Sequence, residues 1–286
     1  MNIIRCFKRS LVIIISMILF IIPFFWFNPF KLDTGGDSTR LYFVEPYLWL
    51  KNVALYSPNA ISGLGDDLPN FMMVPFLLLL MGIKCVVFNS PYFLNIIFCS
   101  ILFLGSFLAI YLTIHELLFN KDVENVRIIA VFAGLFYVLS PMNIYGWFKA
   151  VYALNGIFVY PMLFYLFLKF IKTRRYIFLI YALFLSLIFS VNFSFYTMPW
   201  FFSFMFFSFI FLSYYSFVNK KLTVYIKGLI VFILLFIFIH MFHLLSEAIP
   251  CLDISSTNNQ LIFSEKGKYG RGLVYFLSVQ PFIRLI

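Results

Sequence analysis

Four ionisable side chains lie close together in a polar stretch, LDTGGDSTRLYFVE, at residues 32–45. Asp33, Asp37 and Glu45 supply carboxylates, and Arg40 supplies a guanidinium. A carboxylate that is held beside a reacting group can act as a general base. The glycine pair before Asp37 permits close approach of the backbone to a ligand. This spacing therefore indicates a candidate ligand site around Asp37.

The same residues also fit ordinary structural roles. Asp37 or Ser38 can be the N-cap of a following helix, and this role is compatible with a functional one. Asp33 fits a solvated or capping residue. Glu45 can face a site from the following helix, but only its spacing supports that interpretation.

A second acidic pair, Asp66 and Asp67, lies in the Gly/Pro-rich turn GLGDDLP. Hard divalent cations such as Mg²⁺ or Mn²⁺ prefer oxygen ligands, so the pair is a candidate metal or acceptor site. Aspartate is also common in solvated turns. Both interpretations stay open.

The histidines give a weaker signal. His240 and His243 are three residues apart, so they share one helix face. No acidic or cysteine partner stands at metal-ligand spacing, which favours hydrogen-bonded packing between helices. His115 and Glu116 fall near a predicted span end, where we expect headgroup water to solvate them.

The composition excludes a soluble domain. Of 286 residues, 63% are hydrophobic and only 11% are charged, whereas soluble chains are about one-quarter charged. The mean hydropathy is +0.99. The net charge of +10 is clustered between apolar runs, as in cytoplasmic loops of membrane proteins. The sequence thus predicts an all-α polytopic membrane protein rather than a nucleic-acid-binding one.

About seven transmembrane helices are predicted, at residues 11–27, 92–118, 128–145, 151–170, 176–192, 199–218 and 228–245. Basic clusters at the N-terminus, at KTRR (172–175) and at NKK (219–221) are expected in the cytoplasm. All three basic clusters fall on the same side of the membrane only if residues 71–81 do not cross it. That segment is too short for a span. It is predicted to be re-entrant or interfacial. The chain is then a multi-pass cell-membrane protein with a cytoplasmic N-terminus.

Residues 28–70 become the first external loop in this topology. The loop holds five of the eleven acidic residues. Its middle, residues 41–55, is rich in aromatic side chains and predicts an amphipathic helix at the membrane interface. We expect a transmembrane domain at residues 1–248 and an external tail at 249–286. The tail is interpreted as the start of a truncated continuation of the chain.

Several motifs resemble a known family over roughly residues 1–200. The first part contains GGDS, PYLWLKN and SPNAISGLGDDLPNFMMVPF, and the stretch FAGLFYVLSPMNIYGWF follows at 132–148. This order resembles the GT-C membrane glycosyltransferases, and within them the arabinofuranosyltransferase-like and YfhO-like bacterial membrane proteins. The resemblance implies sugar transfer from a polyprenyl-phosphate donor to a glycan or lipid acceptor on the external face. It maps the family's catalytic carboxylate onto Asp37.

A lipid-phosphate leaving group needs positive charge or a metal to stabilise it. The external candidates are Arg40, Lys51, Lys84 and Lys149. Lys149, in WFKAVY, is the strongest of these, although a lysine that reaches to the interface from a span end is an ordinary alternative.

Two other functions remain open at this stage. One is a transporter, flippase or polymerase-type protein for lipid-linked saccharides, although the spans carry few charged residues. The other is a non-catalytic membrane fragment, because enzymes of this type generally have more than seven spans.

Overall fold

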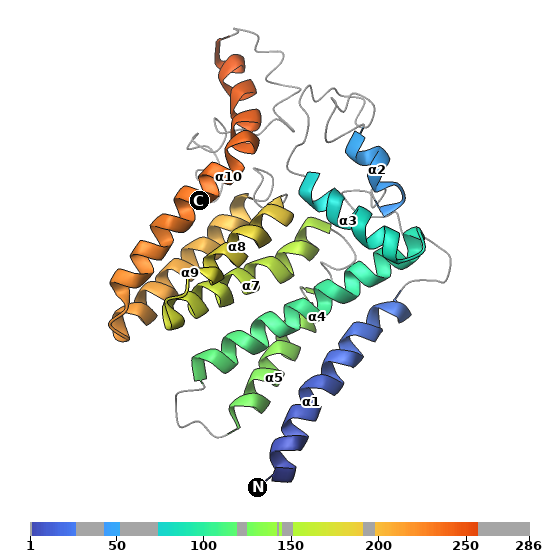
Figure 1. Cartoon of the computed structure of the whole chain (residues 1–286), viewed down its shortest axis with the longest axis vertical. Helices are drawn as coiled ribbons and strands as arrows, with labels where there is room; N and C mark the ends of the chain where they lie inside the picture. The colour runs from blue at the N-terminus through green and yellow to red at the C-terminus, as the bar shows by residue number, and fades with distance from the viewer. Residues whose placement is uncertain are drawn as a thin grey trace.

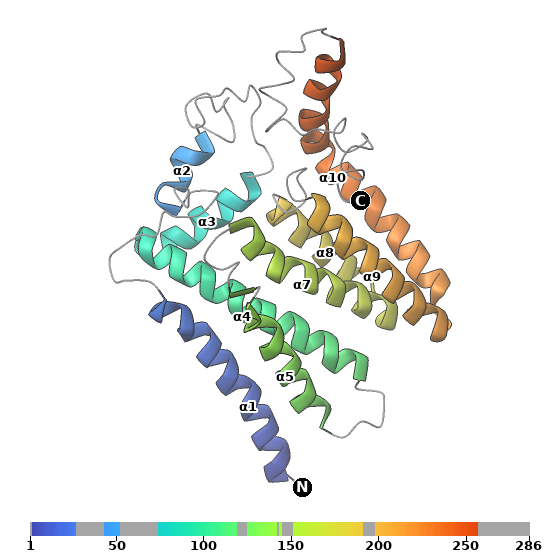
Figure 2. The ribbon, with the colours of Figure 1, turned by 180° about the vertical axis from the view of Figure 1, so that it is seen from behind.

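The computed structural model describes residues 2–26, 43–51, 74–118, 125–141, 143–144, 151–190 and 198–256. Side chains are described within 11–26, 43–51, 74–118, 125–141, 143–144, 155–190 and 202–241. These residues are almost entirely helical and contain no strand (Figures 1 and 2). The elements are α1 (Asn2–Ile21), η1 (Ile22–Phe25), α2 (Pro46–Trp49), α3 (Val74–Val86), α4 (Pro91–Leu118), α5 (Val126–Val138), α7 (Val151–Thr173), α8 (Ile177–Ile188), α9 (Met198–Val218) and α10 (Leu222–Ser256).

Three helical segments are long and apolar enough to cross a membrane, judged on the described residues: Pro91–Leu118, Asn155–Thr173 and Leu222–Met241. Shorter apolar helices accompany them at Leu11–Phe25, Val74–Val86, Val126–Val138, Ile177–Ile188 and Phe202–Val218. A helix satisfies its own backbone hydrogen bonds, which is what a lipid environment requires. The described residues confirm the expected all-helical class and include three helices long enough to span a membrane. The number of seven spans stays a prediction.

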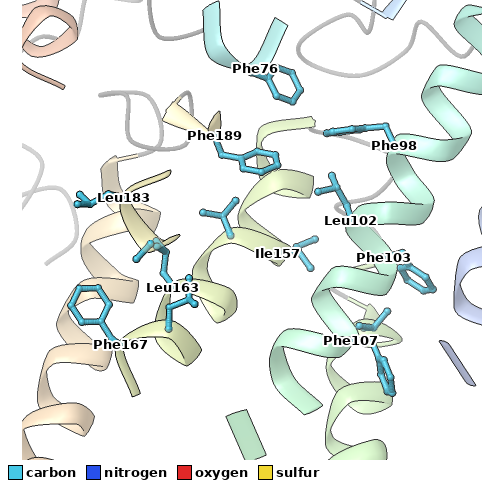
Figure 3. Close-up of a cluster of buried hydrophobic side chains, with 14 of the residues drawn as sticks. Phe76, Phe98, Leu102, Phe103, Phe107, Ile157, Leu163, Phe167, Leu183 and Phe189 are labelled. Carbon is cyan, nitrogen blue, oxygen red and sulfur yellow. The ribbon is translucent and has the colours of Figure 1, made fainter. Parts of the chain in front are cut away.

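Helix α4 forms the centre of the bundle, between α5 and α1 on one side and α7 on the other. Phe98 and Leu102 point from α4 toward Ile157 of α7, whereas Phe103 and Phe107 point to the opposite side of α4 (Figure 3). On that opposite side the Phe103 ring packs edge-on against Trp26, at 5.1 Å between centroids. Apolar packing on both faces explains why α4 is buried over most of its length.

Helices α4 and α7 run side by side in the same direction (Figures 1 and 2). Gly105 of α4 lies against the ring of Phe158 of α7, and eleven residues further along both helices Glu116 meets Lys169. The same sequence separation of 53 residues links both pairs. Equal steps along both helices mean that the two axes stay in register over this distance.

One end of the bundle gathers the basic residues, and we call it the basic end. The C-terminal ends of α4, α7 and α9 meet there with the starts of α5, α8 and α10 (Figure 1). Helices α2 and α3 lie at the opposite end, which we call the outer end. The basic end therefore coincides with the cytoplasmic side that the charge pattern predicts.

Large apolar side chains cover the outside of α8, α9 and α10. Phe238 is 71% exposed, Phe217 is 70% exposed and Phe184 is 62% exposed. Exposed apolar surface on this scale marks an interaction surface in a soluble protein, and here it suits contact with lipid.

Three predicted boundaries differ from the structure. The interfacial helix expected at 41–55 starts at Pro46 rather than at residue 41 and, within the described residues, runs through Trp49 and in π-helical form to Lys51. It starts there because Pro46 lacks the N–H that a helix extending further upstream would need. The segment expected at 71–81 forms α3, whose 13 residues reach Val86 and fall short of the roughly 20 needed to span. Helix α10 continues to Ser256, past the expected domain boundary at 248.

Candidate functional site

An ion pair anchors the first polar segment to the outer end of the bundle. Lys84 Nζ of α3 lies 3.1 Å from Glu45 Oε1, and it also donates a 2.8 Å hydrogen bond to the carbonyl of Val44. The Lys84 side chain is 12% exposed and that of Glu45 is 53% exposed. The lysine is thus held by two acceptors in a mostly buried position, and it fixes residues 44–45 in place.

Aromatic packing holds the same segment from below. Phe43 is 1% exposed, and its ring lies 5.5 Å from that of Phe98 of α4. The Phe98 ring in turn packs at 5.5 Å against Phe76 of α3. Residues 43–51 are therefore docked on α3 and α4, and we call them the docked segment.

Of the predicted site residues, the structure describes Glu45, Lys51 and Lys84. The others, Asp37, Arg40, Lys149, Asp66 and Asp67, lie outside the described residues, as does Asp33. No group of three or more His, Cys, Asp or Glu side chains that could hold a metal occurs where the structure is described. The proposed metal ligands Asp66 and Asp67 are not among the residues searched.

A second polar cluster, at the basic end, was missed by sequence reasoning. Glu116 of α4 accepts a 2.8 Å hydrogen bond from Lys169 of α7 and lies 3.5 Å from Lys172. Lys172 also donates to the Glu116 carbonyl, and Lys221 donates to the Lys172 carbonyl at 3.0 Å. The prediction that Glu116 is merely solvated at a span end is therefore wrong, because two lysines of α7 bind it.

These contacts satisfy helix ends. The last carbonyls of an α-helix have no partner within the helix, and lysines near a helix C-terminus can bind them. Lys172 serves α4 and Lys221 serves α7 in this way. The cluster thus joins α4, α7 and the start of α10, and a helical spacing of three between Lys169 and Lys172 was the sequence signal for it.

His240 is buried between α8 and α10. Its Nε2 lies 3.4 Å from Ser186 Oγ, and its ring packs 4.3 Å from that of Phe236. Ser186 also donates a 2.8 Å hydrogen bond to the Leu183 carbonyl. These contacts fit the expected packing role for His240, whereas the side chain of His243 lies outside the described set.

Two asparagines near the outer ends of α5 and α7 make different contacts. Asn143 donates to the Tyr137 carbonyl, and Tyr137 donates a 2.9 Å hydrogen bond to the Ile157 carbonyl, which links α5 to α7. Asn155 is fully buried, and neither amide atom has a hydrogen-bond partner in the described structure. Tyr137 therefore joins α5 to α7 and Asn143 binds a carbonyl at the end of α5, while Asn155 leaves buried polar atoms unsatisfied.

The hollows found in the described part of the chain are apolar. A surface groove of about 510 Å³ between α7 and α9 is lined by Phe164, Phe207, Ser208, Ile210, Phe211 and Tyr214. A smaller apolar cavity of about 40 Å³ lies between α7, α9 and α10. Neither brings several ionisable groups together. Residues 43–51, the docked segment, are the part of the predicted external loop that the structure describes.

Comparison with known proteins gives no match: no family model, no curated protein and no solved structure is significantly similar to this chain.

Proposed function

We propose that this chain is an integral membrane glycosyltransferase of the GT-C type, which transfers a sugar from a polyprenyl-phosphate donor to a cell-envelope glycan or lipid acceptor. The observation that carries the proposal is the docking of residues 43–51 on the outer end of the bundle, through Lys84 and Phe43. This contact attaches residues 43–51 of the acidic loop to the outer end of the helical bundle. A loop held at that place can meet a lipid-linked donor at the membrane surface.

The proposed topology has seven spans, with α1, α4, α5, α7, α8, α9 and α10 crossing and α3 remaining at the outer end. The N-terminus is cytoplasmic, and the acidic loop at 28–70 is external. The separation of α2 and α3 from the basic end supports this arrangement (Figure 1). The ion pair between Lys84 of α3 and Glu45 of the loop supports the position of α3 at the outer end.

The proposed reaction is a single displacement at the anomeric carbon of the donor sugar. The acceptor hydroxyl oxygen bonds to that carbon while the bond from carbon to phosphate oxygen breaks. Asp37 takes the hydroxyl proton as general base. Polyprenyl phosphate leaves with the electron pair, and Arg40 and Lys149 bind its negative charge.

A divalent cation, Mg²⁺ or Mn²⁺, fits the carboxylates of Asp66 and Asp67, where it would add positive charge toward the phosphate. Glu45 and Lys84 have a different part. Because Lys84 binds both Glu45 and the Val44 carbonyl, we assign the two side chains the positioning of the loop. Glu45 can contact substrate only through its exposed side.

The decisive experiment measures sugar transfer from radiolabelled polyprenyl-phosphate sugars in membranes that contain the full chain. Asp37→Asn should lower transfer by about 100-fold or more, the usual contribution of a general base. Asp33→Asn, four residues earlier in the same loop, is the matched control and should retain transfer. Equal transfer by wild type and Asp37→Asn removes Asp37 from the mechanism. Movement of the labelled lipid across vesicles without glycosidic product indicates a transporter instead.

A further inference from the structure

Three exposed cations lie on two neighbouring turns at the basic end. Arg174 and Arg175 form the turn between α7 and α8, and Lys220 lies in the turn between α9 and α10. Lys221 bonds to the Lys172 carbonyl, which holds the two turns side by side. Three exposed cations therefore lie on two adjoining turns, which we call the rim.

Among the described residues, the acid at this end of the bundle does not pair with these cations. Glu116 is bound by Lys169 and Lys172, and no carboxylate of the described residues pairs with Arg174, Arg175 or Lys220. Within the described part of the chain, the rim therefore presents three exposed positive charges.

The backbone at two of these positions favours glycine rather than a cation. Arg174 has φ 58° and Lys220 has φ 54°, values in the left-handed region where glycine is the usual residue. Lys220 donates to the Phe217 carbonyl and Lys221 to the Ser216 carbonyl, which is the Schellman pattern of a helix end. Arg174 ends α7 with a bond to the Phe170 carbonyl at 2.7 Å. Backbone geometry therefore does not explain the positive side chains.

Apolar surface adjoins the charge. Tyr176, Tyr214 and Phe217 are all more than half exposed beside the two turns. The open groove that includes Phe211 and Tyr214 lies between α7 and α9, the helices whose ends carry Arg174 and Lys220. Cations beside an exposed apolar groove match a molecule with an anionic head and hydrocarbon tails.

We propose that the basic end binds one anionic phospholipid, with its phosphate at Arg174, Arg175 and Lys220 and an acyl chain along the groove between α7 and α9. This binding is independent of sugar transfer. It adds a specific lipid contact to the general preference of loop cations for the cytoplasmic side.

The test uses the purified full chain and counts retained lipid by native mass spectrometry after addition of phosphatidylglycerol or phosphatidylcholine. Wild type should retain one phosphatidylglycerol in preference to phosphatidylcholine. The triple variant R174G/R175Q/K220G should lose the preference, at about fivefold for each charge removed. R5Q/K8Q/R9Q removes the same charge from the N-terminus and should keep the preference.

Thermal unfolding separates lipid binding from simple helix capping. Because glycine suits both left-handed positions, the R174G/K220G variant should match wild type in phosphatidylcholine and lose only the stabilisation by phosphatidylglycerol. Equal losses in both lipids would mean that the cations serve the helix dipoles, and the proposal fails. Displacement of the lipid by millimolar glycerol phosphate would also overturn it, because the ligand would then be a free phosphate compound.

Discussion

Lys169 of α7 reaches Glu116 at the end of α4 with a 2.8 Å hydrogen bond. The pair is partly buried, with side-chain exposures of 26% and 20%, and Lys172 adds a second positive charge to the same carboxylate. Two residues that are 53 positions apart in sequence thereby fix α4 to α7. The pair holds α4 and α7 together at the basic end.

Removing this carboxylate should destabilise the bundle. Glu116→Gln leaves Lys169 and Lys172 without their counter-charge, and a hydrogen bond to a charged group contributes about 1.5 to 3 kcal/mol. We expect a loss of about 2 kcal/mol in free energy of unfolding, measured by denaturant titration in detergent. Glu45→Gln, at a more exposed ion pair, is the control and should lose less. Equal stabilities for Glu116→Gln and wild type would contradict the role given to the pair.

Close packing of α10 on α7 should depend on Gly228. A Cβ at this position would lie 2.0 Å from the ring of Phe170, and Phe170 is buried, so it has little room to move. Gly228→Ala should cost about 1 to 3 kcal/mol, as overpacking usually does. Gly82→Ala is the matched control, because a Cβ there meets nothing within 4 Å, and alanine should gain up to about 1 kcal/mol in a helix. The difference between the two variants is read from thermal unfolding.

The docked segment should loosen when Lys84 is replaced. Lys84→Met removes the contacts to Val44 and Glu45, and hydrogen exchange of residues 44–51 should become faster. Lys51→Met changes an exposed lysine in the same segment and should leave exchange unchanged. The reversed pair E45K/K84E should restore part of the protection; failure to do so would show that the Val44 carbonyl contact dominates.

The proposed topology predicts opposite labelling of two single cysteines. In a background without Cys6, Cys85, Cys99 and Cys251, Ser62→Cys should react with a membrane-impermeant thiol reagent added outside. Thr173→Cys, at the basic end, should react only after the membrane is opened. Labelling of Thr173→Cys from outside would invert the topology and remove the acidic loop from the external face.

The sequence predicts the helical membrane class well, because apolar length and charge position are local properties of the chain. The short α3 was expected for the same reason, since its apolar run is too short to span. The Glu116 cluster was not predicted, because it depends on how α4 and α7 align. The spacing of Lys169 and Lys172 places them on one helix face but does not encode that alignment. The position of the helix that begins at Pro46 also depends on tertiary contacts, namely Lys84 and the burial of Phe43.

The candidate site was predicted from residue types and from a family resemblance. Of its members, Glu45 proves to be an anchor rather than an isolated carboxylate, because its partner Lys84 lies 39 residues away on α3. Sequence reasoning had placed both residues on the external side but had given them separate roles. Pairing over such a distance requires the three-dimensional arrangement.

The common step of α4 and α7 has a consequence for how this chain tolerates changes in length. A residue deleted from α7 between Phe158 and Lys169 would turn the far part of the helix by about 100°, and Lys169 would swing away from Glu116 while Phe158 stayed beside Gly105. A deletion before the start of α7 would leave the contacts Gly105–Phe158 and Glu116–Lys169 in the same register with each other. Insertions and deletions should therefore be harmful inside this helix pair and mild between its members.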